Sequence, residues 1–213
     1  GCVKTQEVVN DESRYLCHVL DRTPGRMLKG PKTKEAATPL IAIEIVRQAA
    51  LIVHALHETG WAYAVRRPES ILWEDLGVPS VQLLDVEKAI RLNVHSEQWD
   101  SHWEDWPIAP ELGARLIVPQ TDVYALGVLL YYALTGETLA HSKNLTVAVL
   151  HSHFPAQVRK LKNFDSLLAE LVRIIERAVS ISPRDRYSSA RDLAEALVEL
   201  LLSTTPAGQK MKS

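Results

Sequence analysis

The sequence predicts a mainly α-helical fold with a small β element at one edge. Apolar residues recur at spacings of three and four in several long segments, which is typical of helices with one buried face. Short segments rich in β-branched and aromatic residues lie before and after the first of these helices. Strands and helices do not alternate regularly, so a parallel βαβ sheet is not expected. With 213 residues, 46% hydrophobic and 23% charged, the chain is long and apolar enough to bury a sizeable core.

The N-terminal third is expected to contain two strands and one long helix. Strands are predicted near residues 3–9 and 14–20, and a turn-rich segment with two prolines and two glycines follows over 22–33. A helix is predicted from about Lys34 to His57, with Gly60 as its stop. Its apolar face would consist of Ile41, Ile45, Ala49, Ile52, Val53 and Leu56.

The rest of the chain predicts two short strands and then mostly helices. The strands are expected at residues 70–73 and 80–86, on either side of a turn at 77–80. Helices are predicted over 121–134, 145–153, 164–179 and 188–202, the last with a capping start at Ser188–Asp192. The polar tail, residues 204–213, is expected to be disordered.

Net charge, cysteine content and the distribution of apolar residues indicate which partners and which cellular setting to expect. A net charge of −2 gives no electrostatic reason to bind nucleic acid. Two cysteines, Cys2 and Cys17, form no disulfide framework, so we expect a reduced, cytoplasmic setting. Charges interrupt each apolar run, so no membrane span is expected. Membrane attachment is expected only if the Gly1-Cys2 start is acylated; otherwise Gly1 is a cleavage remnant.

Several motifs occur in an order that resembles one known family. Ala109-Pro110-Glu111 is an APE motif, "TDVYALGVLLYYALTGE" is similar to a buried central helix, and "RAVSISPRDRYSSARDLAEAL" is similar to a final turn and helix. Together they resemble the C-terminal lobe of a protein kinase of the bacterial serine/threonine type, over about residues 14–202. The resemblance implies residual N-lobe strands and a hinge-like segment in 1–33 and a helical C-lobe in 34–203.

The stretch "AYAVRRPESIL" resembles the catalytic loop of that family. The family pattern is H-R-D-L-x-x-x-N, and counting back from Pro68 places Tyr63, Ala64 and Val65 at the His, Arg and Asp positions and Ser70 at the Asn position. Val65 has no lone pair with which to accept a proton, and a general base contributes about 10²–10⁴-fold in rate. The resemblance therefore predicts a degenerate catalytic loop.

The resemblance places the metal-binding motif at Asp85, where Val86 and Glu87 replace the family's aromatic residue and glycine. One carboxylate without a partner ligand is a poor Mg²⁺ site. We therefore interpret Asp85 as bonding to nearby backbone amides, with cation binding as the alternative. Upstream there is no Gly-rich loop and no V-A-I-K-like strand, so no cofactor is expected. ATP with Mg²⁺ is kept as the alternative.

The residues implied to hold the lobe together are retained. Glu111 and Arg186 occupy the positions of a buried ion pair, and Asp122 occupies a position that binds the catalytic-loop backbone. This contrast predicts a pseudokinase rather than an enzyme, acting as a protein-binding scaffold or regulator. Its expected partner is another protein, such as a kinase or a signalling or assembly component. The alternatives are a nucleotide or small-ligand sensor, and an atypical phosphotransferase completed by another chain.

Aromatic and histidine residues give weaker signals. Trp99, Trp103 and Trp106 would form one stripe on a helix, either as a partner-binding patch or folded back onto the body. His54 and His57 are expected at the surface or in a groove. A metal site is not expected, because His151 and His153 would lie on different helix faces.

Overall fold

A computed structural model describes residues 5–9, 16–20, 25–30, 37–63, 67–93, 106–139 and 164–204. The strands are β1 (Thr5–Val9), β2 (Leu16–Leu20), β3 (Arg26–Met27), β4 (Trp61–Ala62), β5 (Ile71–Asp75), β6 (Pro79–Leu83) and β7 (Ile90–Arg91). The α-helices are α1 (Pro39–Glu58), α2 (Pro119–Thr135), α4 (Phe164–Ala178) and α5 (Ala190–Thr204). Short 3₁₀ helices are η1 (Pro68–Ser70), η2 (Val86–Lys88), η3 (Pro110–Ala114) and η5 (Pro183–Asp185). The fold is mainly α, as predicted.

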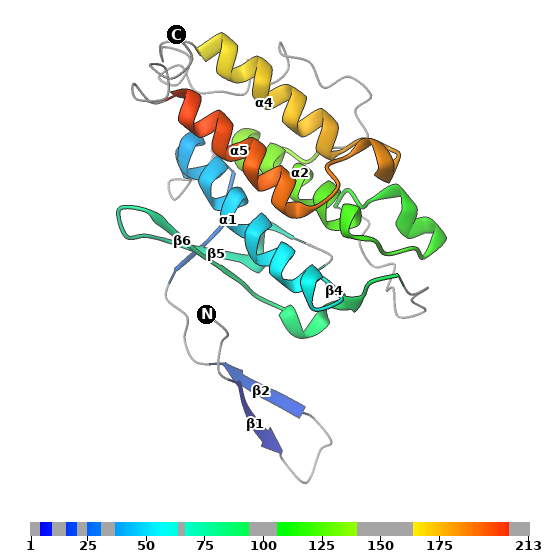
Figure 1. The fold of residues 1–213 in the computed structure, drawn as a ribbon. Helices are drawn as coiled ribbons and strands as arrows, with labels where there is room; N and C mark the ends of the chain where they lie inside the picture. Colours follow the sequence, from blue (N-terminus) through cyan, green and yellow to red (C-terminus); the bar gives the residue numbers. More distant parts are fainter. Residues whose placement is uncertain are drawn as a thin grey trace.

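Helix α1 lies between a small sheet and the other helices (Figure 1). It packs against α5 and α2 on one side and against β6 on another. The main core is formed between these elements, and on α1 it includes Ile45, Ala49 and Val53, which are all fully buried as the periodicity predicts. Ile52, predicted on the same apolar face, is instead 38% exposed. A kinase-like C-lobe with few strands is consistent with this arrangement.

Helix α1 begins five residues later than predicted. The sequence analysis placed its start at Lys34, whereas the helix runs from Pro39 to Glu58. The Ile41 amide donates to the hydroxyl of Thr38 at 3.4 Å, and Pro39 follows at the first helical position, where its missing N–H costs nothing. The Thr-Pro pair was therefore a start signal that the apolar spacing alone did not reveal.

Helix α1 also corrects the expectation about membrane spans. By length and composition alone it could cross a membrane, since its mean hydropathy over 18 residues is 1.6. Its contacts with α2, α5 and β6 instead make it a core helix of this fold. Length and hydropathy cannot distinguish these two environments, because both favour an apolar helix.

Helix α2 is the most buried of the described helices, since the 14 residues from Thr121 to Tyr131 and from Ala133 to Thr135 are all buried. It ends as predicted at Gly136, which has a φ of +73° and donates its amide to the Tyr132 carbonyl. A Cβ on Gly30 would lie 2.2 Å from the Cα of Gly136. The segment before α1 therefore contacts the end of α2 through two glycines, and no larger residue fits at Gly30.

The C-terminal helices match the prediction within two residues. Helix α5 starts with a reciprocal capping box: the Ser189 amide donates to the Asp192 carboxylate and the Asp192 amide donates to the Ser189 hydroxyl, both at 3.1 Å. The sequence placed this capping start correctly.

Three antiparallel sheets are described: β1–β2, β3–β5–β6 and β4–β7. In the second sheet Ile71 pairs with Leu83 and Asp75 with Pro79. Ser70, predicted to begin a strand, instead belongs to η1, and the strand expected over 80–86 ends at Leu83. The domain boundary between 33 and 34, the helix predicted over 145–153, His151 and His153 lie outside the described residues, as do residues 205–213 of the predicted tail. Thr204, which was assigned to the tail, is instead the last residue of α5.

Candidate functional site

Tyr63, at the position of the family's catalytic histidine, connects three segments. Its amide donates to the Asp122 carboxylate at 2.8 Å. Its hydroxyl donates to the Leu84 carbonyl and lies 3.3 Å from the Ser70 carbonyl, which also accepts from the Leu84 amide at 2.8 Å. The start of the catalytic-loop segment, η1 and the end of β6 are thereby joined by side-chain and backbone hydrogen bonds.

Asp122 holds this segment to α2, as the resemblance implied. Its side chain is fully buried, and the same carboxylate oxygen that accepts from Tyr63 lies 2.7 Å from Nε2 of His57. A buried carboxylate requires such partners, because an unpaired charge inside a protein is strongly destabilising. One acidic residue thus connects α2 to both α1 and the segment that follows it.

His57 was expected at the surface or in a groove. Its side chain is only 6% exposed, so the surface alternative was wrong. Its Nδ1 atom is buried and has no hydrogen-bond partner among the described residues. His57 is therefore part of the frame around Asp122. The periodicity could not reveal this, since the partner is 65 residues away in the sequence.

The degenerate catalytic-loop positions are only partly described. Ala64 and Val65 lie outside the described residues, whereas Tyr63 and Ser70 are both buried. Ser70 ends η1, and its hydroxyl lies 3.5 Å from a carboxylate oxygen of Asp85. The Asn and Asp positions of the family's metal site therefore converge in this chain as well.

Asp85 pairs with a lysine rather than with backbone amides. It adopts a left-handed conformation (φ +56°), which aspartate tolerates better than most residues, and its side chain makes no capping hydrogen bond to η2. Its other oxygen lies 2.9 Å from Nζ of Lys88. In a 3₁₀ turn residues three apart lie over one another, which brings these two side chains together. The interpretation of Asp85 as an acceptor of amide bonds was wrong.

This site does not fit a Mg²⁺ ion as it is built. Magnesium requires several oxygen ligands in octahedral geometry. Asp85 offers one carboxylate, already paired with the Lys88 ammonium, and Ser70 offers one hydroxyl. No cluster of three or more His, Cys, Asp or Glu side chains occurs in the parts of the chain that the structure describes.

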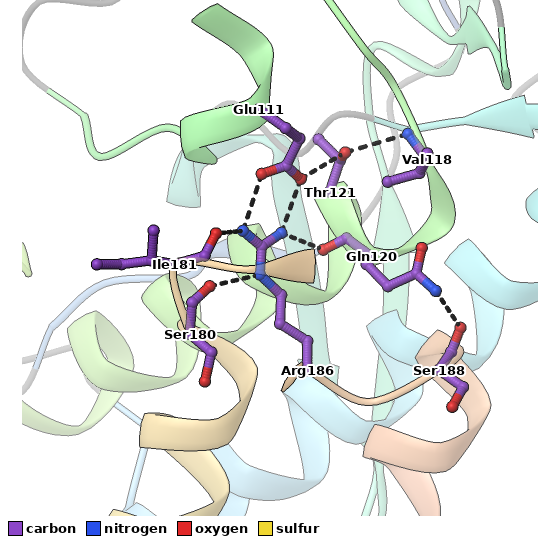
Figure 2. Close-up of polar contacts among 8 residues, drawn as sticks. All are labelled: Glu111, Val118, Gln120, Thr121, Ser180, Ile181, Arg186 and Ser188. Carbon is purple, nitrogen blue, oxygen red and sulfur yellow. Dashed lines mark hydrogen bonds and ion pairs between the residues drawn. The ribbon is translucent and has the colours of Figure 1, made fainter. Parts of the chain in front are cut away.

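The ion pair implied between Glu111 and Arg186 is present (Figure 2). Both carboxylate oxygens of Glu111 accept from the guanidinium, at 2.7 and 2.8 Å. The remaining donors of Arg186 bind the carbonyls of Gln120, Ser180 and Ile181. Five N–H donors thus have five acceptors, and the Arg186 side chain is fully buried.

Neighbouring groups complete this buried network. The Thr121 hydroxyl donates to Glu111 at 2.9 Å and accepts from the Val118 amide at 3.2 Å, which also satisfies the first turn of α2. The guanidinium lies 4.9 Å from the ring centre of Tyr124. Burial alone would raise the pKa of Glu111, but its hydrogen bonds, above all those from Arg186, lower the pKa below its usual value.

Of the predicted tryptophan stripe only Trp106 is described. It is half-buried and packs edge-to-face on Tyr132 of α2, with ring centres 5.5 Å apart. For Trp106 the structure favours the alternative that the ring folds back onto the body. Trp99 and Trp103 lie outside the described residues, as do Gly1 and Cys2.

Several relatives of this chain are bacterial serine/threonine-protein kinases. It is 26% identical over 190 residues to a probable serine/threonine-protein kinase of Clostridium perfringens, covering 86% of this chain and 27% of the relative. It is 26% identical over 194 residues to Pkn1 of Myxococcus xanthus (84% and 28%) and 24% identical over 191 residues to PknB of Mycobacterium tuberculosis (84% and 29%). This chain has a protein kinase-like domain. No family model matches it.

These relatives overturn one prediction. The chain was expected not to be an enzyme, on the basis of Val65, Ser70 and the missing upstream motifs. The relatives are named serine/threonine-protein kinases, which points to a kinase, so that prediction was wrong. The match spans only 27–29% of the length of these three relatives.

Sequence reasoning missed three contributors to the site. His57 and Thr121 complete the buried networks around Asp122 and Glu111, and Lys88 neutralises Asp85. Only Lys88 had a local signal, because it lies three residues after Asp85. The other two bind residues that come close only in the folded chain.

Proposed function

We propose that this kinase-like domain is a regulatory module that binds another protein, such as a kinase or a signalling or assembly component. The observation that supports this most is the turn between β5 and β6, the hairpin tip Leu76–Val78. Leu76 is 69% exposed and Val78 is 66% exposed, so two large aliphatic side chains face solvent on either side of Gly77 in one turn. Large exposed apolar groups that lie together favour a contact with a partner.

The hairpin tip is held in a fixed position. The Gly77 amide donates to the Asp75 carboxylate at 3.1 Å, and Gly77 has a φ of +90°, which few other residues adopt easily. The Gln48 side chain of α1 donates to the Pro79 carbonyl at 2.6 Å. Below the tip, Trp73 of β5 is buried in the core. A rigid apolar tip binds a partner with little loss of conformational entropy.

A further exposed aliphatic side chain lies on α1, the helix whose Gln48 binds the hairpin. Ile52 follows Gln48 by one helical turn, so the two side chains lie on neighbouring positions of the helix surface. Ile52 is 38% exposed although it is aliphatic. We therefore include Ile52 with the hairpin tip in the proposed contact surface.

The test uses a photo-crosslinking amino acid at position 76 of the full-length protein in its own cells. We expect one protein to be crosslinked from position 76 and not from position 181, where Ile181 is equally apolar and more exposed but lies far from the hairpin in sequence. The purified partner should then bind the double variant Leu76→Asp/Val78→Asp at least tenfold more weakly, and Ile181→Asp normally. Equal crosslinking at both positions, or unchanged affinity of the double variant, would contradict the proposal.

Phosphoryl transfer is a second candidate, which the names of the relatives favour. It is tested by incubating the full-length protein with γ-labelled ATP and a general protein substrate. Transfer that is lost in Asp85→Asn and retained in Asp165→Asn, an exposed aspartate on α4, would support this candidate. Absence of transfer under conditions in which a known kinase is active would count against it.

A further inference from the structure

The hairpin tip is convex rather than hollow. The β5–β6 hairpin extends away from the helices at the edge of the domain (Figure 1). In the described part of the chain, nothing lies within 4 Å of the position that a Cβ on Gly77 would occupy. The exposed side chains of Leu76 and Val78 follow on either side of this glycine. Two projecting aliphatic groups are suited to entering a pocket on a partner rather than to receiving a segment of one.

The hairpin is also acidic. Residues 71–83 contain two carboxylates and no lysine, arginine or histidine. The two acidic residues, Glu74 and Asp75, come directly before Leu76; Asp75 is exposed and Glu74 is partly exposed. The carboxylate of Asp75 accepts from the Gly77 amide at 3.1 Å, which fixes this charge next to the aliphatic tip.

These two charges are not compensated within the domain. Neither carboxylate forms an ion pair with another described residue. On neighbouring α1, by contrast, Glu44 pairs with Arg47 at 2.6 Å. Arg26 lies in the same sheet, on β3, but its guanidinium lies over the Trp73 ring, 5.2 Å from the ring centre. The aliphatic tip is therefore bordered by negative charge that a partner can neutralise.

Uncompensated charge beside an apolar anchor restricts which surface can cover it. A carboxylate that loses water at an interface destabilises the complex unless a cation or a donor pairs with it. A second copy of this tip, or an anionic lipid surface, would bring like charges together. A surface with lysine or arginine beside an apolar pocket would instead attract the tip and speed association.

We propose, on the basis of the protein-binding function above, that the hairpin tip inserts into an apolar pocket of a folded partner protein whose rim carries lysine or arginine. Leu76 and Val78 fill the pocket, and their burial slows dissociation. Glu74 and Asp75 pair with the basic rim and speed association. The partner surface is thus apolar at its centre and positively charged around it.

The experiment measures association and dissociation rates with one probe, the purified protein that is crosslinked from position 76. The double variant Glu74→Gln/Asp75→Asn removes both charges, and the new Asn side chain still offers an oxygen to the Gly77 amide. In about 0.1 M salt, where the screening length is about 10 Å, its association rate should fall by at least about threefold. In about 1 M salt, where the length is about 3 Å, the difference should disappear. The dissociation rate should change by less than about twofold.

The matched control is Asp165→Asn/Glu176→Gln, which removes two exposed charges from α4 and should leave both rates unchanged. Leu76→Ala/Val78→Ala should mainly raise the dissociation rate. Equal association rates of Glu74→Gln/Asp75→Asn and the wild type in low salt would overturn this inference alone, provided that the alanine variant still weakens binding.

Other outcomes would overturn the protein-binding function as well. These are the absence of a protein crosslinked from position 76, and unchanged affinity of Leu76→Ala/Val78→Ala. Sedimentation of the chain alone tests the second copy as occupant, and phosphatidylcholine vesicles test a lipid surface. A dimer or vesicle binding that is lost in the alanine variant would assign the tip to that occupant and overturn the inference.

Discussion

Arg186 and Glu111 form a two-pronged ion pair in which every guanidinium N–H has an acceptor and neither side chain is more than 7% exposed. The pair connects η3 to the segment between α4 and α5, which are 75 residues apart in sequence. Because water cannot replace either partner, the pair acts as a fixed joint between these segments.

Arg186→Met should destabilise the domain by about 3–5 kcal/mol, the usual cost of leaving one member of a buried pair unpaired. It would remove the guanidinium donors of Glu111, which would keep only the Thr121 hydroxyl among its side-chain partners, and of three carbonyls. Arg186→Lys should recover little, because an ammonium has three donors and cannot bind both carboxylate oxygens side by side. Urea unfolding measures both variants. A loss below about 1 kcal/mol for Arg186→Met would show that the pair does not stabilise the fold.

The lowered pKa of Glu111 predicts a loss of stability in acid. Its folded-state pKa lies below the ordinary value of 4.5, so its contribution is complete at pH values above 4.5. It is lost as pH falls from there through the folded-state pKa, where the folded protein finally takes up the proton. Glu111→Gln should be less stable at pH 7 and should show a flatter dependence on pH below 4.5. Urea midpoints between pH 7 and 3 test this, and parallel curves for variant and wild type would contradict it.

The sequence predicted the helices better than the contacts between them. Helices α2, α4 and α5 were placed within two residues, because apolar spacing and capping residues are local signals. The start of α1 was misplaced because the apolar pattern continues before the Thr38-Pro39 cap. Periodicity reports which face is buried, and it does not determine where the backbone first satisfies its own hydrogen bonds.

The residues of the candidate site were also predicted only in part. Glu111, Arg186 and Asp122 were expected from the resemblance, and all three lie in buried networks. His57 was missed because its role depends on Asp122, which only the fold brings near. The pairing of Asp85 with Lys88 depends on a 3₁₀ turn and a left-handed residue, and neither follows from residue types alone.

Asp122→Ala should destabilise the domain and loosen the segment around Tyr63. It removes the acceptor of the Tyr63 amide and of His57 Nε2. Each orphaned buried group costs about 1–3 kcal/mol, so a total loss of roughly 2–6 kcal/mol is expected. Amide exchange should accelerate at residues 61–63, where one of these hydrogen bonds ends. Asp165→Ala, at an exposed position of α4, serves as the control and should change neither property.

Gly127 lies where α2 closely approaches the C-terminal end of α4. A Cβ at this position would lie 2.7 Å from the Cβ of Ala178 and 2.9 Å from Cγ1 of Val179. The Val179 methyl can rotate away, but the Ala178 Cβ moves only with the backbone of α4. Replacing glycine by alanine inside a helix gains about 0.5–1 kcal/mol, whereas overpacking a core costs about 1–3 kcal/mol. The packing term is the larger, so Gly127→Ala should be destabilising overall.

Two further variants separate packing from backbone effects. Gly113→Ala is the control, because nothing lies within 4 Å of a Cβ there and its φ is not positive, so its stability should change little. The double variant Gly127→Ala/Ala178→Gly moves the methyl group from one helix to the other and should be more stable than the sum of the two single variants predicts. Thermal and urea unfolding of the wild type, Gly127→Ala, Ala178→Gly and the double variant measure this coupling. Strict additivity would show that Ala178 does not limit the approach of α4, and that the backbone of α2 alone determines the effect of Gly127→Ala.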